Sequence, residues 1–202
     1  MSFTFQGESY DYCRGKYNAA WTNERCVEVP IIYSKVCAHR PQRVLEIGNV
    51  LQHYYDVHHD ILDKYEKAPG VVNQDVVDFQ PVHDYDLIVS ISTFEHIGRD
   101  GLETSQRDDA KVIHALENVW KWLSPTGAAW ITMPLGYARP LDQFWRSGML
   151  GFSKEYYMHL VKRAEGTWEQ GSTAIWEQGF EEQVELQYPF DHVVWLLIGV
   201  MR

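Results

Sequence analysis

Short apolar runs recur along this chain and alternate with a segment of helical periodicity. Residues 43–50 (RVLEIGNV), 86–92 (DLIVSIS) and 128–134 (AAWITMP) are short and rich in branched side chains, as in strands buried on both faces. Between residues 108 and 123 the apolar positions follow the spacing of one helical face: Val112, Ile113, Leu116, Val119, Trp120 and Leu123. Strands that alternate with helices predict an α/β fold, with a mostly parallel sheet and helices on both faces.

The C-terminal third predicts a different strand arrangement. A helix is expected around residues 153–163, followed by strands at 184–189 (VELQYP) and 192–201 (HVVWLLIGVM). A two-residue PheAsp turn joins these two strands, and parallel strands cannot be connected by so short a link. The sheet should therefore end in an antiparallel C-terminal hairpin.

The chain length of 202 residues predicts one domain, 1–202, in which residues 1–40 form an N-terminal cap and a helix. Residues 1 to about 24 are aromatic and polar without a sustained period, which favours an ordered cap or lid over a core element. For residues 25–39 two interpretations stay open. A helix can start at Pro30, because proline suits a first helical position, but Val27, Val29 and Ile31 also alternate as in a strand.

Charge and composition exclude several classes of protein. The formal net charge of -10 opposes binding to nucleic acid, whose phosphates are neutralised by Lys and Arg. No stretch reaches the ~18 apolar residues needed to cross a bilayer, and the N-terminus lacks the pattern of a signal peptide. Three cysteines without paired spacing favour a reducing cytoplasmic setting. His53, His58, His59 and Asp60 form the densest group of possible metal ligands, but we predict no metal site, because adjacent histidines in or beside a strand point to opposite faces and rarely share one ion.

Polar residues end the predicted strands. Two shorter candidate strands, 59–63 (HDILD) and 71–75 (VVNQD), lie between the runs at 43–50 and 86–92. Glu46, Gly48 and Asn49 follow the first strand, Asp63 ends the second and Asp75 the third, and the segment from Ser92 to His96 follows the fourth. In an open α/β sheet the ligand lies beyond the carboxyl ends of the strands, near the point where the strand order reverses. We therefore expect a ligand site built from these residues.

Five segments in order, VLEIGNV, ILDKYE, NQDVVDF, YDLIVSISTFEHIG and LSPTGAAWITMPLG, resemble the class I S-adenosylmethionine-dependent methyltransferases, a Rossmann-like family. The resemblance covers roughly residues 40–137. It departs from the family pattern in the glycine motif, since Gly48 stands alone where the family has two or three glycines. The connection to the second strand is also short, which predicts a stub of helix or a loop there.

The resemblance implies S-adenosylmethionine as cofactor and methyl transfer by in-line displacement. Carried over residue by residue, it implies a cofactor site that includes Glu46, Gly48, Asn49, Asp63, Lys64, Asp75, Val76 and Ser92, closed by Tyr17 and Asn18 of the cap. The chemistry agrees, because a strand-end carboxylate can accept hydrogen bonds from ribose hydroxyls, and a sulfonium cation favours acids and aromatic faces.

His96, with Glu95, is the candidate catalytic base, although packing of the loop explains this pair equally well. Tyr137, Arg139 and Asp142 follow the fifth strand, where the family builds its acceptor site, and an irregular packed loop is the other interpretation. Because nucleic acid and membrane are excluded, a small molecule or saccharide is the expected acceptor. The alternative function is a catalytically degenerate methyltransferase-like module that binds a protein or glycan partner.

Overall fold

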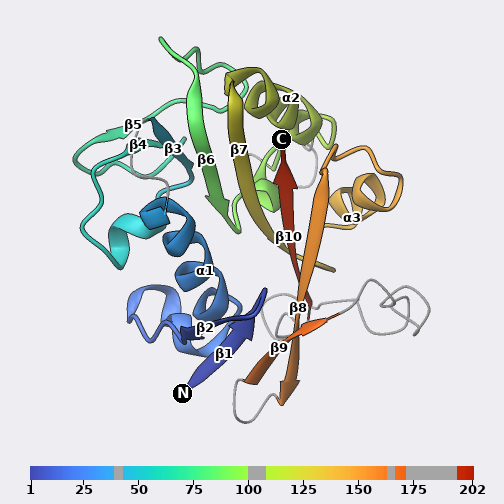
Figure 1. Ribbon diagram of the computed structural model, residues 1–202. Coiled ribbons are helices and arrows are strands. Elements are labelled where there is room, and N and C mark those ends of the chain that lie inside the picture. Colours follow the sequence, from blue (N-terminus) through green and yellow to red (C-terminus); the bar gives the residue numbers. More distant parts are fainter. Residues whose placement is uncertain (39–42, 100–107, 163–166, 172–194) are drawn as a thin grey trace.

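An eight-stranded sheet forms the centre of the computed structural model, which describes residues 1–38, 43–99, 108–162, 167–171 and 195–202 (Figure 1). The strand order is β5-β4-β3-β6-β7-β10-β8-β9. In chain order the strands are β3 (Val44–Ile47), β4 (Asp60–Leu62), β5 (Val71–Val72), β6 (Tyr85–Ile91), β7 (Leu123–Pro134), β8 (Lys154–Lys162), β9 (Thr167–Gly171) and β10 (Trp195–Met201).

The first five strands of the sheet are parallel, and the order along the chain reverses between β3 and β6. β10 runs antiparallel to both β7 and β8. The predicted fold class, a mostly parallel Rossmann-like sheet with an antiparallel C-terminal part, is thus confirmed. The predicted hairpin partner at 184–189 lies outside the described residues, and the described neighbours of β10 are β7 and β8.

Helices cover both faces of the sheet (Figure 1). On one face, α1 (Arg25–Ala38) packs Val29 and Ile32 in a cluster with Leu87 and Val89 of β6. On the other face, α2 (Lys111–Trp122) and α3 (Arg139–Arg146) pack in a second cluster that includes Ile88. Neighbouring residues of β6 therefore face opposite helices, which explains why this strand is apolar at nearly every position.

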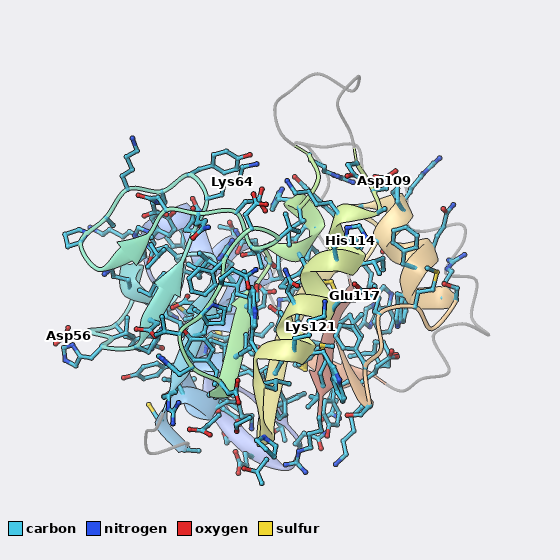
Figure 2. The ribbon with its side chains drawn as sticks, turned by 90° about the horizontal axis from the view of Figure 1, so that it is seen from above. Asp56, Lys64, Asp109, His114, Glu117 and Lys121 are labelled. Carbon is cyan, nitrogen blue, oxygen red and sulfur yellow. The ribbon has the colours of Figure 1, made fainter. Side chains whose placement is uncertain are left out.

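The amphipathic pattern of α2 places one side of the helix in the core and the other in solvent. Figure 2 shows His114, Glu117 and Lys121 along the outer side of this helix, and all three are exposed. Ala115 and Val119 lie on the inner side and are fully buried. No helix in the described parts of the chain is long and apolar enough to cross a membrane.

α1 begins at Arg25, so the prediction that the helix starts at Pro30 was wrong, as was the strand alternative. Proline inside a helix leaves the carbonyl four residues earlier without its usual donor. Here that carbonyl belongs to Cys26, and it accepts a hydrogen bond from the backbone N–H of Cys13 at 2.9 Å. The N-terminal segment thus supplies the donor that Pro30 lacks.

The N-terminal residues contribute to the core, contrary to the expectation of a cap alone. β1 (Ser2–Phe5) and β2 (Glu8–Asp11) form an antiparallel hairpin. Phe3 and Phe5 are buried in a cluster that also contains residues of α1 and β10. The 3-10 helix η1 (Tyr17–Thr22) follows the hairpin and leads into α1.

Residues 154–162 form strand β8, so the predicted helix around 153–163 was wrong. Tyr157 packs in the cluster that contains α2 and α3, whereas Met158 packs in the cluster that contains α1 and the hairpin. A strand buried on both faces lacks the polar and apolar alternation that distinguishes a strand from a helix.

Candidate functional site

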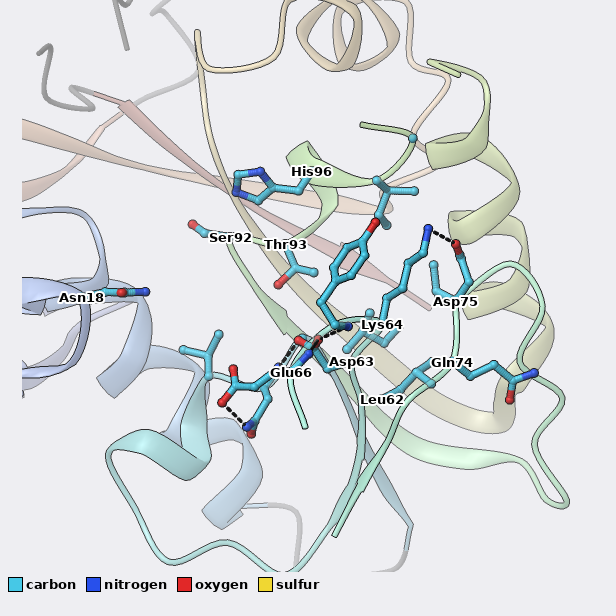
Figure 3. A pocket seen from close by; sticks show the side chains of 18 of the residues that line it. Asn18, Leu62, Asp63, Lys64, Glu66, Gln74, Asp75, Ser92, Thr93 and His96 are labelled. Atoms are coloured by element: carbon cyan, nitrogen blue, oxygen red, sulfur yellow. Dashed lines mark hydrogen bonds and ion pairs between the residues drawn. The ribbon is translucent and has the colours of Figure 1, made fainter. Parts of the chain in front are cut away.

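A cavity of about 430 Å³ opens at the carboxyl ends of β3, β4 and β6, where the strand order reverses (Figure 3). In Figure 3 Asn18 lies on one side of it, Lys64 and Asp75 lie on the other, and Ser92 and Thr93 lie between. The lining residues are Tyr17, Asn18, Arg25, Ile47, Gly48, Asn49, Val50, Leu62, Asp63, Lys64, Tyr65, Glu66, Gln74, Asp75, Val76, Ser92, Thr93, His96, Ile97 and Gly98.

Most of the residues predicted from the sequence meet in this cavity. Those in the lining are Tyr17, Asn18, Gly48, Asn49, Asp63, Lys64, Asp75, Val76, Ser92 and His96. Those outside the lining are Glu46, Glu95, Tyr137, Arg139 and Asp142. The short first connection contains only the 3-10 helix η2 (Leu51–His53), as predicted, and Leu51 is fully buried and does not enter the lining.

The turn after β3 requires glycine for two reasons. Gly48 has a φ of +87°, which side chains other than glycine rarely adopt. A Cβ at this position would also lie 2.2 Å from Oγ1 of Thr93, which belongs to the predicted segment Ser92 to His96. Gly48 therefore allows the loop after β6 to pack directly against the turn.

Glu46 does not line the cavity but stabilises this turn through hydrogen bonds to its backbone. Its carboxylate is fully buried, and Oε1 accepts hydrogen bonds from the backbone N–H groups of Val50 (2.9 Å) and Leu51 (2.7 Å). Oε2 lies 2.8 Å from Nε2 of His59. Glu46 therefore holds the turn that lines the cavity without being part of the lining, and its direct contact with a ligand stays a prediction.

Histidines grouped in the sequence have separate carboxylate partners. His59 contacts Glu46, and Nε2 of His53 lies 2.7 Å from Oε1 of Glu66. Among the described residues, no group of three or more His, Cys, Asp or Glu side chains is arranged to hold a metal ion.

Asp63 and Glu66 form the acidic wall after β4. Oδ2 of Asp63 accepts a hydrogen bond from the N–H of Asn49 at 3.0 Å, and Oδ1 accepts from the N–H groups of Tyr65 and Glu66 at 2.8 and 2.7 Å. Asp63 therefore ties the loop after β4 to the turn after β3. The carboxylate of Glu66 lies beside it and accepts from Nδ2 of Asn49 at 3.0 Å, although the sequence analysis did not select Glu66.

Asp75 pairs with two lysines at the far end of the cavity. Nζ of Lys111 lies 2.7 Å and Nζ of Lys64 3.0 Å from Oδ2 of Asp75. Burial alone would raise the pKa of Asp75, but the hydrogen bonds from Lys111 and Lys64 outweigh it and hold the pKa below its usual value. Asp75 is thus a carboxylate at neutral pH.

Ser92 ends β6 in a strained conformation, with a φ of +40°. Its Oγ donates a hydrogen bond of 2.6 Å to Oε1 of Glu28, a fully buried residue of α1. Burial, with the nearby charge of Glu24, raises the pKa of Glu28 from the usual 4.5 to about 7. Glu28 lies 64 residues from Ser92 in the sequence, and nothing in the apolar pattern of its helix marks it as part of a site.

Two polar atoms of the lining residues are buried without a hydrogen-bond partner among the described residues. One is a donor, Nη1 of Arg25 at the start of α1, and the other is an acceptor, Oδ1 of Asn49. Leaving such atoms unpaired is costly, and their presence beside a cavity favours a ligand that offers an acceptor to Arg25 and a hydrogen-bond donor to Asn49.

His96 extends from the 3-10 helix η3 (Phe94–His96) toward the segment after β7, and its side chain is about half exposed. Partial burial and the charges of Arg99 and Arg25 lower the pKa of His96, which favours the neutral imidazole. Its ring packs edge-on against Tyr137 at 5.2 Å, so Tyr137 lies beside His96 although it does not line the cavity. Glu95 is buried, and burial raises its pKa well above the usual value.

Asp142 and Arg139 do not reach the cavity. The carboxylate of Asp142 accepts hydrogen bonds from the N–H of Gly136 at 3.1 and 3.3 Å, and burial raises the pKa of Asp142 to about 6. Arg139 is exposed at the start of α3. Asp142 thus stabilises the turn after β7, and its contact with an acceptor stays a prediction.

No protein-family model matches the sequence, and no curated protein gives a significant match. Solved structures that are similar in fold include the N-methyltransferase NodS from Bradyrhizobium japonicum WM9 in complex with S-adenosyl-L-homocysteine (11% identity, 84% of this chain and 82% of that chain, TM-score 0.48). A possible histamine N-methyltransferase from Thermotoga maritima has 12% identity over 84% of this chain and 87% of that chain, with a TM-score of 0.44. The plantazolicin methyltransferase BpumL has 13% identity over 85% and 81%, with a TM-score of 0.45. The strand order by itself defines the sheet as Rossmann-like.

Proposed function

We propose that the protein binds S-adenosylmethionine in the cavity above Gly48 and transfers its methyl group to a small molecule or saccharide. The observation that carries this proposal is the convergence of Asn49, Asp63, Asp75 and Ser92, the residues that follow four successive parallel strands, on one cavity at the switch point. A cavity of about 430 Å³ is in the range of small-molecule sites.

The donor set of the cavity fits this cofactor at both ends. The buried, unpaired Nη1 of Arg25 is suited to the carboxylate of the methionine moiety, and the unpaired Oδ1 of Asn49 to its ammonium group. Asp63 and Glu66 can accept hydrogen bonds from ribose hydroxyls through lone pairs that their contacts with backbone and side chains leave available.

The acidic character of the lining argues against a dinucleotide. A pyrophosphate requires several glycines or basic groups, and Gly48 is the one glycine in the turn after β3. Lys64 and Lys111, which lie beside the cavity, both form ion pairs with Asp75, so both already have an anionic partner within the protein.

Bound S-adenosylmethionine supplies a methyl group already activated by the sulfonium, so the protein has to align the acceptor and exclude water. Tyr17 and Asn18 of η1 line the cavity, and Asn18 lies on the side opposite Asp75 (Figure 3), so η1 can limit access of water there. His96, neutral at physiological pH, is placed to remove a proton from an acceptor hydroxyl or amine, with Tyr137 beside it.

Isothermal titration of the protein with S-adenosylmethionine, S-adenosylhomocysteine and NADH tests the proposal. We expect micromolar affinity for the first two and no binding of NADH. Asp63→Ala should weaken cofactor binding at least tenfold. The substitution removes a carboxylate from the cavity lining and the hydrogen bonds that connect the turn after β3 to the loop after β4. Asp56→Ala is the matched control, since the Asp56 side chain is 91% exposed on the loop between β3 and β4 (Figure 2).

Transfer is then measured with methyl-labelled cofactor and a panel of small amines, phenols and amino sugars. A labelled product would show that the protein is a methyltransferase. Cofactor binding without transfer to any acceptor favours the degenerate binding module instead. Absence of binding at high micromolar cofactor would contradict the proposed function and leave the degenerate module as the remaining alternative.

A further inference from the structure

The carboxyl group of Glu28 lies directly behind the cavity wall. Glu28 projects from the first turn of α1, is fully buried, and accepts the hydrogen bond from Ser92 Oγ at 2.6 Å. Ser92 itself lines the cavity. A single serine hydroxyl therefore separates this carboxyl from a ligand in the cavity.

The surroundings of Glu28 are unusually acidic for a protein interior. Glu24, and Glu95 of η3, both lie close enough for their charges to interact with that of Glu28. Oε2 of Glu28 and Oε2 of Glu95 are both buried without a hydrogen-bond partner among the described residues. Arg25 is the nearby cation, and its charge acts on all three carboxyls.

Buried carboxyls with unsatisfied oxygens are costly, and a positive charge nearby reduces that cost. The effect is strong here because the protein interior between Glu28 and the cavity screens charge far less than water does. A cationic group that touches Ser92 therefore gains more from Glu28 than a neutral group of the same shape.

We propose that Glu28 is a specificity-determining residue that makes the cavity prefer positively charged S-adenosylmethionine over S-adenosylhomocysteine, in which the sulfur is neutral. This inference rests on the proposed function, because it assumes that the cavity binds this cofactor with its sulfur near Ser92. The two ligands differ by one methyl group and one unit of charge at the sulfur atom, so a carboxylate close to this atom gives them different affinities. Such a preference also favours release of the demethylated product.

The preference should depend on pH. The pKa of Glu28 is about 7, and a sulfonium nearby lowers it, so binding of S-adenosylmethionine releases protons around neutral pH. Affinity for S-adenosylmethionine should rise as pH increases through 7, and affinity for S-adenosylhomocysteine should change much less. The other titrating group of the lining near this point is His96, whose pKa is lowered and which therefore titrates below 6.5.

The experiment compares dissociation constants of the two ligands at pH 8 for the wild type, Glu28→Gln and Glu155→Gln. Glutamine keeps an oxygen that can accept the Ser92 hydrogen bond, and it removes the charge. Glu28→Gln should weaken the binding of S-adenosylmethionine about tenfold, which is the magnitude expected for the loss of one partly buried charge near the ligand. The binding of S-adenosylhomocysteine should weaken less than about twofold. Glu155→Gln is the control, because Glu155 accepts hydrogen bonds from Trp145 and the hydroxyl of Tyr157 away from the cavity.

Equal weakening of both ligands by Glu28→Gln, or no change in either, would overturn the inference while the proposed function stands. If neither ligand binds the wild type, the proposed function itself fails. Should Glu28→Gln not fold, titrations of the wild type in two buffers of different ionisation enthalpy decide the question. Proton release at pH 7 with S-adenosylmethionine and little with S-adenosylhomocysteine supports the inference, and equal release with both contradicts it.

Discussion

At the scale of single residues, the site combines groups whose charge states the fold has altered. His96 is kept neutral by partial burial and by the charges of Arg99 and Arg25, whereas Asp75 is kept ionised by Lys64 and Lys111. A neutral imidazole beside a sulfonium site can accept a proton and adds no positive charge that would repel the cofactor.

His96→Asn should lower kcat at least about tenfold for a hydroxyl acceptor and leave KM for S-adenosylmethionine nearly unchanged, because the imidazole acts on the acceptor. In the wild type, kcat should fall as pH decreases through a pKa below 6.5. Steady-state kinetics across pH 5–9 measure both effects. His58→Asn is the control, since the His58 side chain is 85% exposed, and a rise in KM with constant kcat in the His96 variant would argue for a packing role.

At the scale of elements, the 3-10 helix η1 is fastened to the loop after β3. The ring of Tyr17 stacks on His53 with centroids 3.5 Å apart, and the hydroxyl of Tyr54 donates to the Tyr17 carbonyl at 2.9 Å. Asn18 and Ala19 have positive φ values of 48° and 47°. Such a strained conformation persists only where surrounding contacts hold it, and these contacts hold η1 at the border of the cavity.

Tyr17→Ala should weaken binding of S-adenosylmethionine by about tenfold, mainly through faster dissociation, because the stack with His53 is lost and η1 is released. Stopped-flow displacement measures the dissociation rate. Trp21→Ala serves as control, because Trp21 is 51% exposed in the same helix and does not line the cavity. Unchanged dissociation in the Tyr17 variant would show that η1 does not close over the ligand.

At the scale of the whole molecule, the acidic chain buries carboxyl groups whose pKa values are raised. The pKa of Glu28 is raised to about 7, that of Asp142 to about 6, and that of Glu95 well above its usual value. In each case burial disfavours the charged form. An acid with a raised pKa in the folded state stabilises the fold at low pH. That contribution is lost as pH rises through the folded pKa.

The difference in Tm between Glu28→Gln and the wild type should therefore increase in favour of the variant from pH 5 to pH 8, by several degrees. Differential scanning calorimetry measures it, and Glu155→Gln should show no such trend. A constant difference across this range would mean that Glu28 ionises alike in the folded and unfolded chain.

The sequence alone determined the sheet and the edge at which the site lies. Strands β3 and β6 and the second half of β7 (128–134) are mostly apolar because they are buried on both faces, and α2 carries a clear helical period. Local pattern and tertiary environment therefore agree in these elements. Asp63, Asp75 and Ser92 were found because the ends of parallel strands share one edge of the sheet.

Only the tertiary structure decided which side chains face the cavity and what each one contacts. Glu28 and Arg25 lie on a helix far from the strand ends in sequence, and their role depends on how α1 packs over β6. Glu46 and Asp142 lie outside the lining of the cavity and accept hydrogen bonds from backbone N–H groups of nearby turns. β8 was taken for a helix because burial on both faces removes the alternation that marks a strand. Periodicity records which residues are buried, whereas partners distant in the sequence are set by packing, and for this reason they could not be predicted from it.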